Sequence, residues 1–213
     1  MKKILLATTL LASTAGFAAA EVAVTGTARM GVTTDTISGD AQFSSRFRVI
    51  FTASGETDGG LTFGASVRND QIGTGGTANG DSTVYISGAF GKLTMGDTGN
   101  AADSLVGQVS GVGYTSLGSM NELAWTYKNT TGAQYEYSAG ALTFALGLGQ
   151  TNTSEDLVSA AVKYSTDAYS VALGYEDNNS GSEISALGSA TFSGATVKAK
   201  IVNGDFTPDT AYA

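Results

Sequence analysis

The sequence of 213 residues contains no cysteine, no histidine and a single proline, Pro208. Without cysteine there is no disulfide framework, so stability has to come from hydrogen bonding and packing. Without histidine or cysteine, a Ser–His or Cys–His nucleophile pair and the usual zinc sites are excluded. We therefore expect no enzyme, no catalytic or metal-binding residues and no cofactor.

Positive charge is also scarce, with 11 Lys and Arg against 19 Asp and Glu and a net charge of −8. A nucleic-acid partner is not expected, because phosphate binding requires a basic surface. After the first twenty residues there is no long apolar run, which excludes a helical membrane protein. Glycine is abundant at 29 residues, and together with many Thr, Ser, Tyr and Phe it suits strands and tight turns.

The N-terminus has the features of an export signal. Lys2 and Lys3 precede an apolar run over residues 4–11, and three alanines at 18–20 supply a small-residue cleavage site. The apolar run is too short to cross a bilayer as a helix, which takes about 20 residues. We expect residues 1–20 to be a cleaved signal peptide and residues 21–213 to form a β-barrel domain.

Apolar and polar residues alternate strictly in many segments of the remaining chain. In one of them Phe47 and Val49 alternate with Arg46 and Arg48. Many segments run about nine to twelve residues, which is the length of a tilted strand that crosses a bilayer, whereas strands of soluble sandwiches have about five or six residues. The pattern predicts an all-β fold, a transmembrane antiparallel up-and-down β-barrel, with a soluble sandwich as the alternative.

The connections between these segments alternate between short and long. Short links are expected near residues 55–60, 90–92, 138–140, 165–168 and 193–194, and longer polar links near 35–41, 70–81, 99–131, 150–156, 177–183 and 204–210. Short turns on one side and long loops on the other are typical of an outer-membrane barrel. Residues 177–183 loosely resemble a calcium-binding loop, but we interpret them as a polar turn.

The link from about residue 99 to 131 is far longer than the others, and such a loop within a compact domain is usually functional or disordered. It mixes apolar residues, such as Leu105 and Val106, with the acids Asp103 and Glu122. This mixture favours a segment that packs against the inside of the barrel. The alternatives are a large extracellular loop or an extra strand in residues 123–128.

Nearly all basic residues of the barrel domain fall on polar faces of the expected strands. Four arginines occur at a similar height on the first three strands, and neighbouring strands are about 5 Å apart. Such a cluster is untenable in a dry core, whereas a water-filled lumen or the solvated face of a soluble sheet tolerates it. The expected basic wall of the pore consists of Arg29, Arg46, Arg48, Arg68, Lys198 and Lys200.

Several stretches resemble the general porins of α-proteobacteria. They include FSSRFRVIFTASGETD at 43–58, GLTFGA at 60–65 and VYISGAFGKLTMGD at 84–97. The resemblance implies a sixteen-stranded, homotrimeric channel whose third loop folds into the lumen. It also implies that the four arginines form the wall cluster, with Asp97, Asp103 and Glu122 as acids of the constriction loop.

We count about eleven strands and the start of a twelfth at residues 211–213, and therefore expect a sequence that lacks its C-terminal strands. The expected function is that of an outer-membrane porin, a water-filled channel for passive diffusion of ions and small hydrophilic solutes, surrounded by outer-membrane lipid. The alternative is a non-conducting secreted or surface β-protein, such as an adhesin or binding module.

Overall fold

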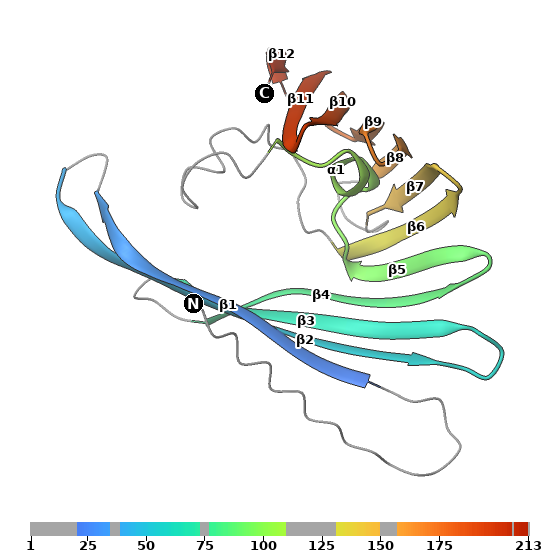
Figure 1. The fold of residues 1–213 in the computed structure, drawn as a ribbon, viewed down its shortest axis with the longest axis horizontal. Coiled ribbons are helices and arrows are strands. Elements are labelled where there is room, and N and C mark those ends of the chain that lie inside the picture. Colours follow the sequence, from blue (N-terminus) through green and yellow to red (C-terminus); the bar gives the residue numbers. More distant parts are fainter. Residues whose placement is uncertain are drawn as a thin grey trace. The chain divides into compact units, whose positions relative to one another are not determined.

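The computed structural model describes residues 21–34, 39–72, 77–109, 131–149, 157–205 and 207–212. The chain divides into two compact units, Met1–Ser82 (unit 1) and Thr83–Ala213 (unit 2). The strand order follows the sequence from β1 to β12, as in an antiparallel up-and-down meander (Figure 1). The described part of the chain has no helix that combines the length and apolar character needed to cross a membrane.

Unit 1 holds three long strands and the beginning of a fourth. They are β1 (Glu21–Thr34), β2 (Ala41–Glu56), β3 (Thr62–Ile72) and β4 (Thr77–Gly88). The register of β1 with β2 runs without a break from Glu21 opposite Ser54 to Thr34 opposite Ala41. Because side chains alternate along each strand, this register brings most of the polar positions of the pair to one face.

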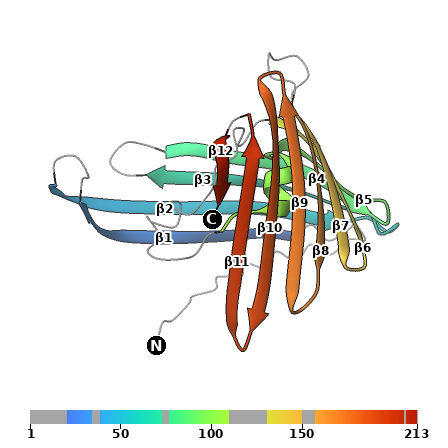
Figure 2. The same cartoon turned by 90° about the horizontal axis from the view of Figure 1, so that it is seen from above.

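In its described residues, unit 2 continues with the rest of β4, one short helix and eight further strands. They are β5 (Gly91–Asp97), α1 (Ala101–Val106), β6 (Thr131–Ala139), β7 (Leu142–Leu148), β8 (Val158–Ser165), β9 (Tyr169–Asn178), β10 (Gly181–Phe192), β11 (Ala195–Gly204) and β12 (Thr207–Tyr212). Strands β8 to β11 run side by side as long hairpins (Figure 2). They curve around α1, which lies on their concave side (Figure 1).

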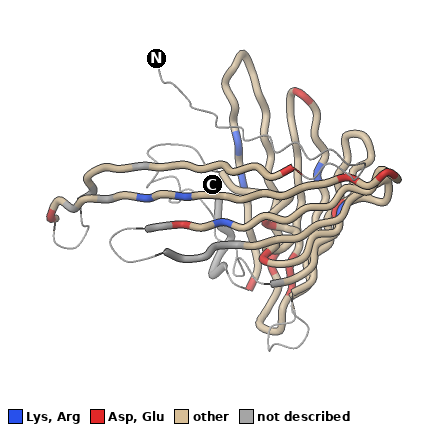
Figure 3. The backbone as a smooth tube through the Cα atoms, turned by 90° about the horizontal axis from the view of Figure 1, so that it is seen from below, with Lys and Arg blue, Asp and Glu red and all other residues tan. Residues whose placement is uncertain are grey.

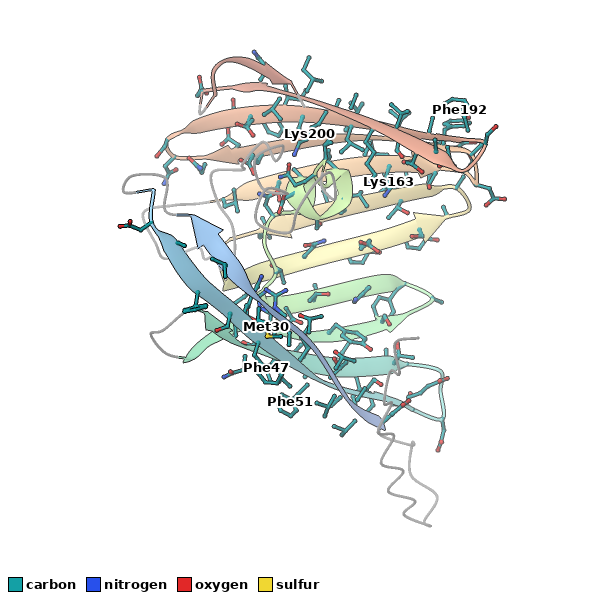
Figure 4. All side chains as sticks on the ribbon, turned by 60° about the vertical axis from the view of Figure 1, so that its left-hand side comes forward. Met30, Phe47, Phe51, Lys163, Phe192 and Lys200 are labelled. Atoms are coloured by element: carbon teal, nitrogen blue, oxygen red, sulfur yellow. The ribbon has the colours of Figure 1, made fainter. Side chains whose placement is uncertain are left out.

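One face of each strand from β1 to β11 exposes large apolar side chains. Met30 is 92% exposed, and Phe47 and Phe51 are about half exposed on the neighbouring strand (Figure 4). In unit 2 the outward residues of β9 include Val171 and Leu173, again about half exposed. Soluble monomers rarely expose a continuous apolar face of this size, whereas the lipid-facing side of a barrel has this character.

Three of the expected long links were predicted too long, because the strands on either side reach further than predicted. In place of the link at 70–81, β3 ends at Ile72 and β4 begins at Thr77. Strand β9 ends at Asn178 and β10 begins at Gly181, so within residues 177–183 only 179–180 form a tight turn between paired strands. The side chain of Asn178 closes it by accepting a hydrogen bond from the Ser180 amide, 2.7 Å, as Asn does in Asx-turns. Likewise β12 begins at Thr207, not near residue 211, and tolerates Pro208 close to its start.

Candidate functional site

Three arginines of unit 1 converge on a single carboxylate. Asp70 receives Arg48 in a two-point ion pair, with Nε at 2.6 Å and Nη2 at 2.9 Å. The Nη2 atom of Arg46 lies 3.0 Å from the Asp70 Oδ2 atom, and Nε of Arg68 lies 3.3 Å from the same oxygen. We call these four residues the arginine cluster; the basic positions of unit 1 lie on neighbouring strands (Figure 3).

The strand register explains why the cluster forms. Arg48 of β2 stands directly opposite Asp70 of β3, and side chains of such cross-strand partners are close enough to interact. Arg46 lies two residues along β2 and Arg68 two residues along β3, so both share the face of Asp70. The carboxylate therefore sits between three guanidinium groups.

The charges of the arginine cluster do not balance, because three guanidiniums and one carboxylate leave a net charge of +2. The side chain of Asp70 is only 5% exposed, whereas Arg46, Arg48 and Arg68 keep 27%, 27% and 29% of their side-chain surface exposed. Arginine stays charged at any working pH. The cluster therefore presents permanent positive charge to water around a nearly buried anion.

Arg29, also expected in the basic wall, lies on β1 directly opposite Arg46 in the register. Its backbone is thus beside the arginine cluster, and its side chain lies outside what the structure describes. The cluster member that the sequence interpretation did not assign to the site is Asp70. Its signal was present, because Asp70 follows Arg68 by two residues and therefore shares its face of the strand.

The second feature is a segment of the long link, residues 99–109, which we call the inner segment. It lies on the polar face of unit 2 against β7 to β10, so the expected inward folding is confirmed for these residues. Residues 110–130, including the alternative strand at 123–128, lie outside the described part of the chain.

Polar contacts fix the start of the inner segment. Asn100, which is buried, caps α1 by accepting the Asp103 amide on its side-chain oxygen at 2.6 Å. Its Nδ2 atom donates to the Glu176 carboxylate of β9, also at 2.6 Å. The Ala101 amide donates to Oγ of Ser159 on β8 at 2.8 Å. A helix start leaves amide groups without helical partners, and here a side-chain cap and a strand hydroxyl satisfy two of them.

Apolar packing holds the body of α1. Ala102 and Val106 lie in one buried cluster with Ala172 of β9 and Leu187 of β10. Ala101 and Leu105 lie in a second cluster with small residues of β7 and β8. These inward strand positions alternate with the exposed apolar positions, so α1 covers the face opposite the outer apolar one.

Lys200 fastens the end of the inner segment. Its side chain donates to the Gly107 carbonyl at 2.9 Å and to Oε1 of Gln108 at 2.8 Å, and the residue is only 2% exposed. Figure 4 shows Lys200 beside α1. Gln108 in turn donates to Asp103 at 3.1 Å. Lys200 thus lies beneath the inner segment, whereas Lys198, two residues earlier on β11, is exposed.

The three acids expected in the constriction loop are not brought together among the described residues. Asp103 lies in α1 and is half-buried, and Asp97 is half-buried at the end of β5. Glu122 lies outside the described residues. In the part of the chain that the structure describes, no group of three acidic, histidine or cysteine side chains is arranged to hold a metal ion.

The sequence matches the family model of the Gram-negative porins over residues 7–213. The chain belongs to the Gram-negative porin family. It is 37% identical to a porin of Rhodobacter capsulatus over 91% of this chain and 71% of the relative. These observations confirm the expected outer-membrane porin channel and its location in the outer membrane, and nothing supports the non-conducting alternative.

Solved porin structures share the fold of this porin. One porin structure superposes with a TM-score of 0.70 and 31% identity, over 90% of this chain and 75% of the other. A variant of the Rhodopseudomonas blastica porin gives a TM-score of 0.65 at 21% identity, over 90% of this chain and 88% of the other. The expected antiparallel porin-type barrel architecture is thus confirmed.

Proposed function

We propose that the arginine cluster sets the ion preference of this porin and that the inner segment narrows its passage. The observation that carries the first part is the convergence of three partly exposed guanidiniums on the nearly buried Asp70. A net charge of +2 on a wetted wall attracts anions and repels cations within about 8–10 Å, the screening distance at physiological salt. Charged walls and rings set selectivity in pores by this means.

The proposed role of the inner segment rests on its position. It covers the polar face of β7 to β10 and is held there by Asn100, Ser159 and Lys200. A peptide segment bound to the wetted face of a barrel reduces the cross-section available to solutes. Asp103, half-buried on α1, places an acidic group on the segment, and Glu122 stays a predicted second acid.

The apolar outer faces support insertion into outer-membrane lipid. On β1 the outward apolar positions extend from Val22 to Val32, and on β2 from Phe43 to Ala53. Eleven residues span about 34 Å along a strand, which becomes about 24 Å at a tilt near 45°, close to the apolar band of outer-membrane barrels. We further propose a homotrimer and cleavage of residues 1–20 as a signal peptide.

Planar-bilayer recording of the protein, extracted in detergent from its outer membrane, tests these proposals. Discrete openings that arrive in groups of three are expected for a trimeric channel. The zero-current potential in a salt gradient reports the ion preference. A folded, membrane-extracted protein that never conducts would contradict the channel function. Openings that arrive singly would contradict the proposed trimer.

A further inference from the structure

The inner segment lies on a part of the sheet whose inward side chains are mostly small. Most inward positions of β7, β8 and β9 beneath it carry small side chains or none, and three of them are directly opposite one another across these strands. This floor, which we call the seat, consists of Ala145, Gly147, Ser159, Ala161, Ala172 and Gly174. Glycine weakens a strand interior, and its presence there often marks close approach of another backbone.

Gly174 lies so close to α1 that there is no room for a side chain. A Cβ atom at this position would lie 2.8 Å from both the Ala102 Cβ atom and a methyl carbon of Val106. Carbon atoms pack at about 3.5–4.0 Å. Because Gly174 does not have a positive φ, the backbone conformation accepts any residue, and the space occupied by α1 is what requires glycine.

Gly147 shows the same restriction at the start of the helix. A Cβ atom there would lie 2.5 Å from Oγ of Ser159 and 3.0 Å from the Ala101 amide nitrogen. The two glycines therefore meet α1 in its first turn and along its body. By contrast, a Cβ atom at Gly188 of β10 would meet nothing within 4 Å.

We propose that Gly174, assisted by Gly147, sets the size limit of the channel by fixing how deeply α1 sits against the wall. The inference rests on the proposed role of the inner segment as a constriction. Each atom added to the seat lifts α1 away from the sheet and into the passage. Both glycines are thus specificity-determining positions, although neither contacts the solute.

The test is a graded series at Gly174 in the full-length protein, recorded in planar bilayers with polyethylene glycols of increasing size as sieving probes. Gly174→Ala should lift α1 by about 1 Å, the difference between the 2.8 Å approach and normal carbon packing. We expect unitary conductance to fall by roughly 1.5-fold and the excluded polymer size to fall with it. Gly174→Val should lower both further, and the control Gly188→Ala should leave both unchanged.

A compensating variant distinguishes a change in the position of α1 from a general disruption of the fold. Ala102→Gly with Val106→Ala removes both carbon atoms that the new methyl group of Gly174→Ala would meet. The triple variant should therefore recover most of the lost conductance and the original size limit. If Gly174→Ala yields no folded protein, Ala102→Val decides instead, because it adds the bulk on the helix and leaves the sheet unchanged.

The outcomes distinguish this proposal from the proposed function. A conducting, folded Gly174→Ala or Ala102→Val variant with unchanged conductance and size limit would overturn the role of the seat and leave the channel intact. A loss of conductance that the triple variant does not recover would also overturn it. Failure of the unaltered protein to conduct would instead contradict the proposed function itself.

Discussion

The inward faces of the two units differ in whether their charged side chains stay exposed to water or are covered. In unit 1 the face carries four charged side chains in contact, and the three arginines stay more than a quarter exposed. In unit 2 the face is built from small residues and is covered by α1, with Lys200 and Glu176 almost completely buried. Alternating strands thus produce one face that acts by remaining open to water and another that acts by holding a second element.

The difference has an energetic cause. An exposed guanidinium keeps much of its hydration, so the arginine cluster requires only one carboxylate to hold three cations together. A buried charge without hydrogen-bond partners is very costly. Lys200 and Glu176 each hydrogen-bond to the inner segment, so departure of the segment would remove partners from two buried charges. The buried charges on this face are therefore stabilised only while the inner segment stays bound.

The largest effect is expected from removing charge from the open face. Replacing Arg46 and Arg48 together by glutamine removes two positive charges, which interact with a passing ion at about 5 Å by nearly 1 kcal/mol each in water. We expect the permeability ratio of cations to anions to rise roughly tenfold. The zero-current potential in a potassium chloride gradient measures this ratio.

The matched control for this double variant keeps the charge and changes the shape. Arg46→Lys with Arg48→Lys should retain most of the native permeability ratio, because ammonium groups replace the guanidiniums. A zero-current potential that is unchanged in the glutamine variant would remove these two arginines from the conducting path.

A smaller effect of opposite sign is expected at Asp70. Asp70→Asn removes the negative charge of the arginine cluster, raises its net charge from +2 to +3 and should favour anions by roughly threefold. Asp58→Asn makes the same change in net charge at an exposed residue of the β2–β3 turn. If the two variants shift the zero-current potential equally, the effect belongs to overall charge and not to the cluster.

The contrast between the units also marks how far the sequence alone could lead. The alternation of apolar and polar residues predicted that Arg46, Arg48 and Arg68 share a face, because charged residues are easily recognised at the polar positions of such a pattern. Asp70 was on the predicted face but was not assigned to the cluster, since its pairing with residues 22 and 24 positions away depends on the strand register. Register is set by pairing between strands.

The seat of unit 2 was less accessible to sequence reasoning. The composition of residues 99–131 predicted an inward segment, but Gly147 and Gly174 carry no chemical signal that relates them to Ala101 or Ala102. Their role is visible only once α1 is placed. The link at 177–183 was predicted too long because polar composition is the same in a loop and in a strand end that extends into water.

Lys200→Met should weaken the coupling between the covered face and the inner segment. The change removes the charged donor of two hydrogen bonds, to Gly107 and Gln108, and a hydrogen bond of a charged group contributes about 1.5–3 kcal/mol. We expect amide exchange in α1 to accelerate at least about tenfold, together with larger fluctuations of the open-channel current. Lys198→Met, on the exposed neighbour of the same strand face, is the control and should do neither.

The two lysine variants have to differ in their current fluctuations if Lys200 acts by attaching the inner segment. If Lys198→Met increases current fluctuations as much as Lys200→Met does, the fluctuations reflect charge on β11 and not the attachment of the inner segment. Ion preference should change little in Lys200→Met, because Lys200 is only 2% exposed and its ammonium group is already bonded to Gly107 and Gln108.

The smallest effect is expected at Ser159, where a single neutral hydrogen bond joins the two elements. Ser159→Ala removes the acceptor of the Ala101 amide, and a neutral hydrogen bond contributes about 1 kcal/mol, equivalent to roughly fivefold faster exchange of that amide. Ser138→Ala, whose hydroxyl pairs with Thr143 on the neighbouring strand, should leave exchange of Ala101 unchanged. Equal exchange in the Ser159 variant and the native protein would mean that the Ser159 hydroxyl does not help to hold the inner segment, and that the contacts of Asn100 with Glu176 and of Lys200 with Gly107 carry the polar attachment instead.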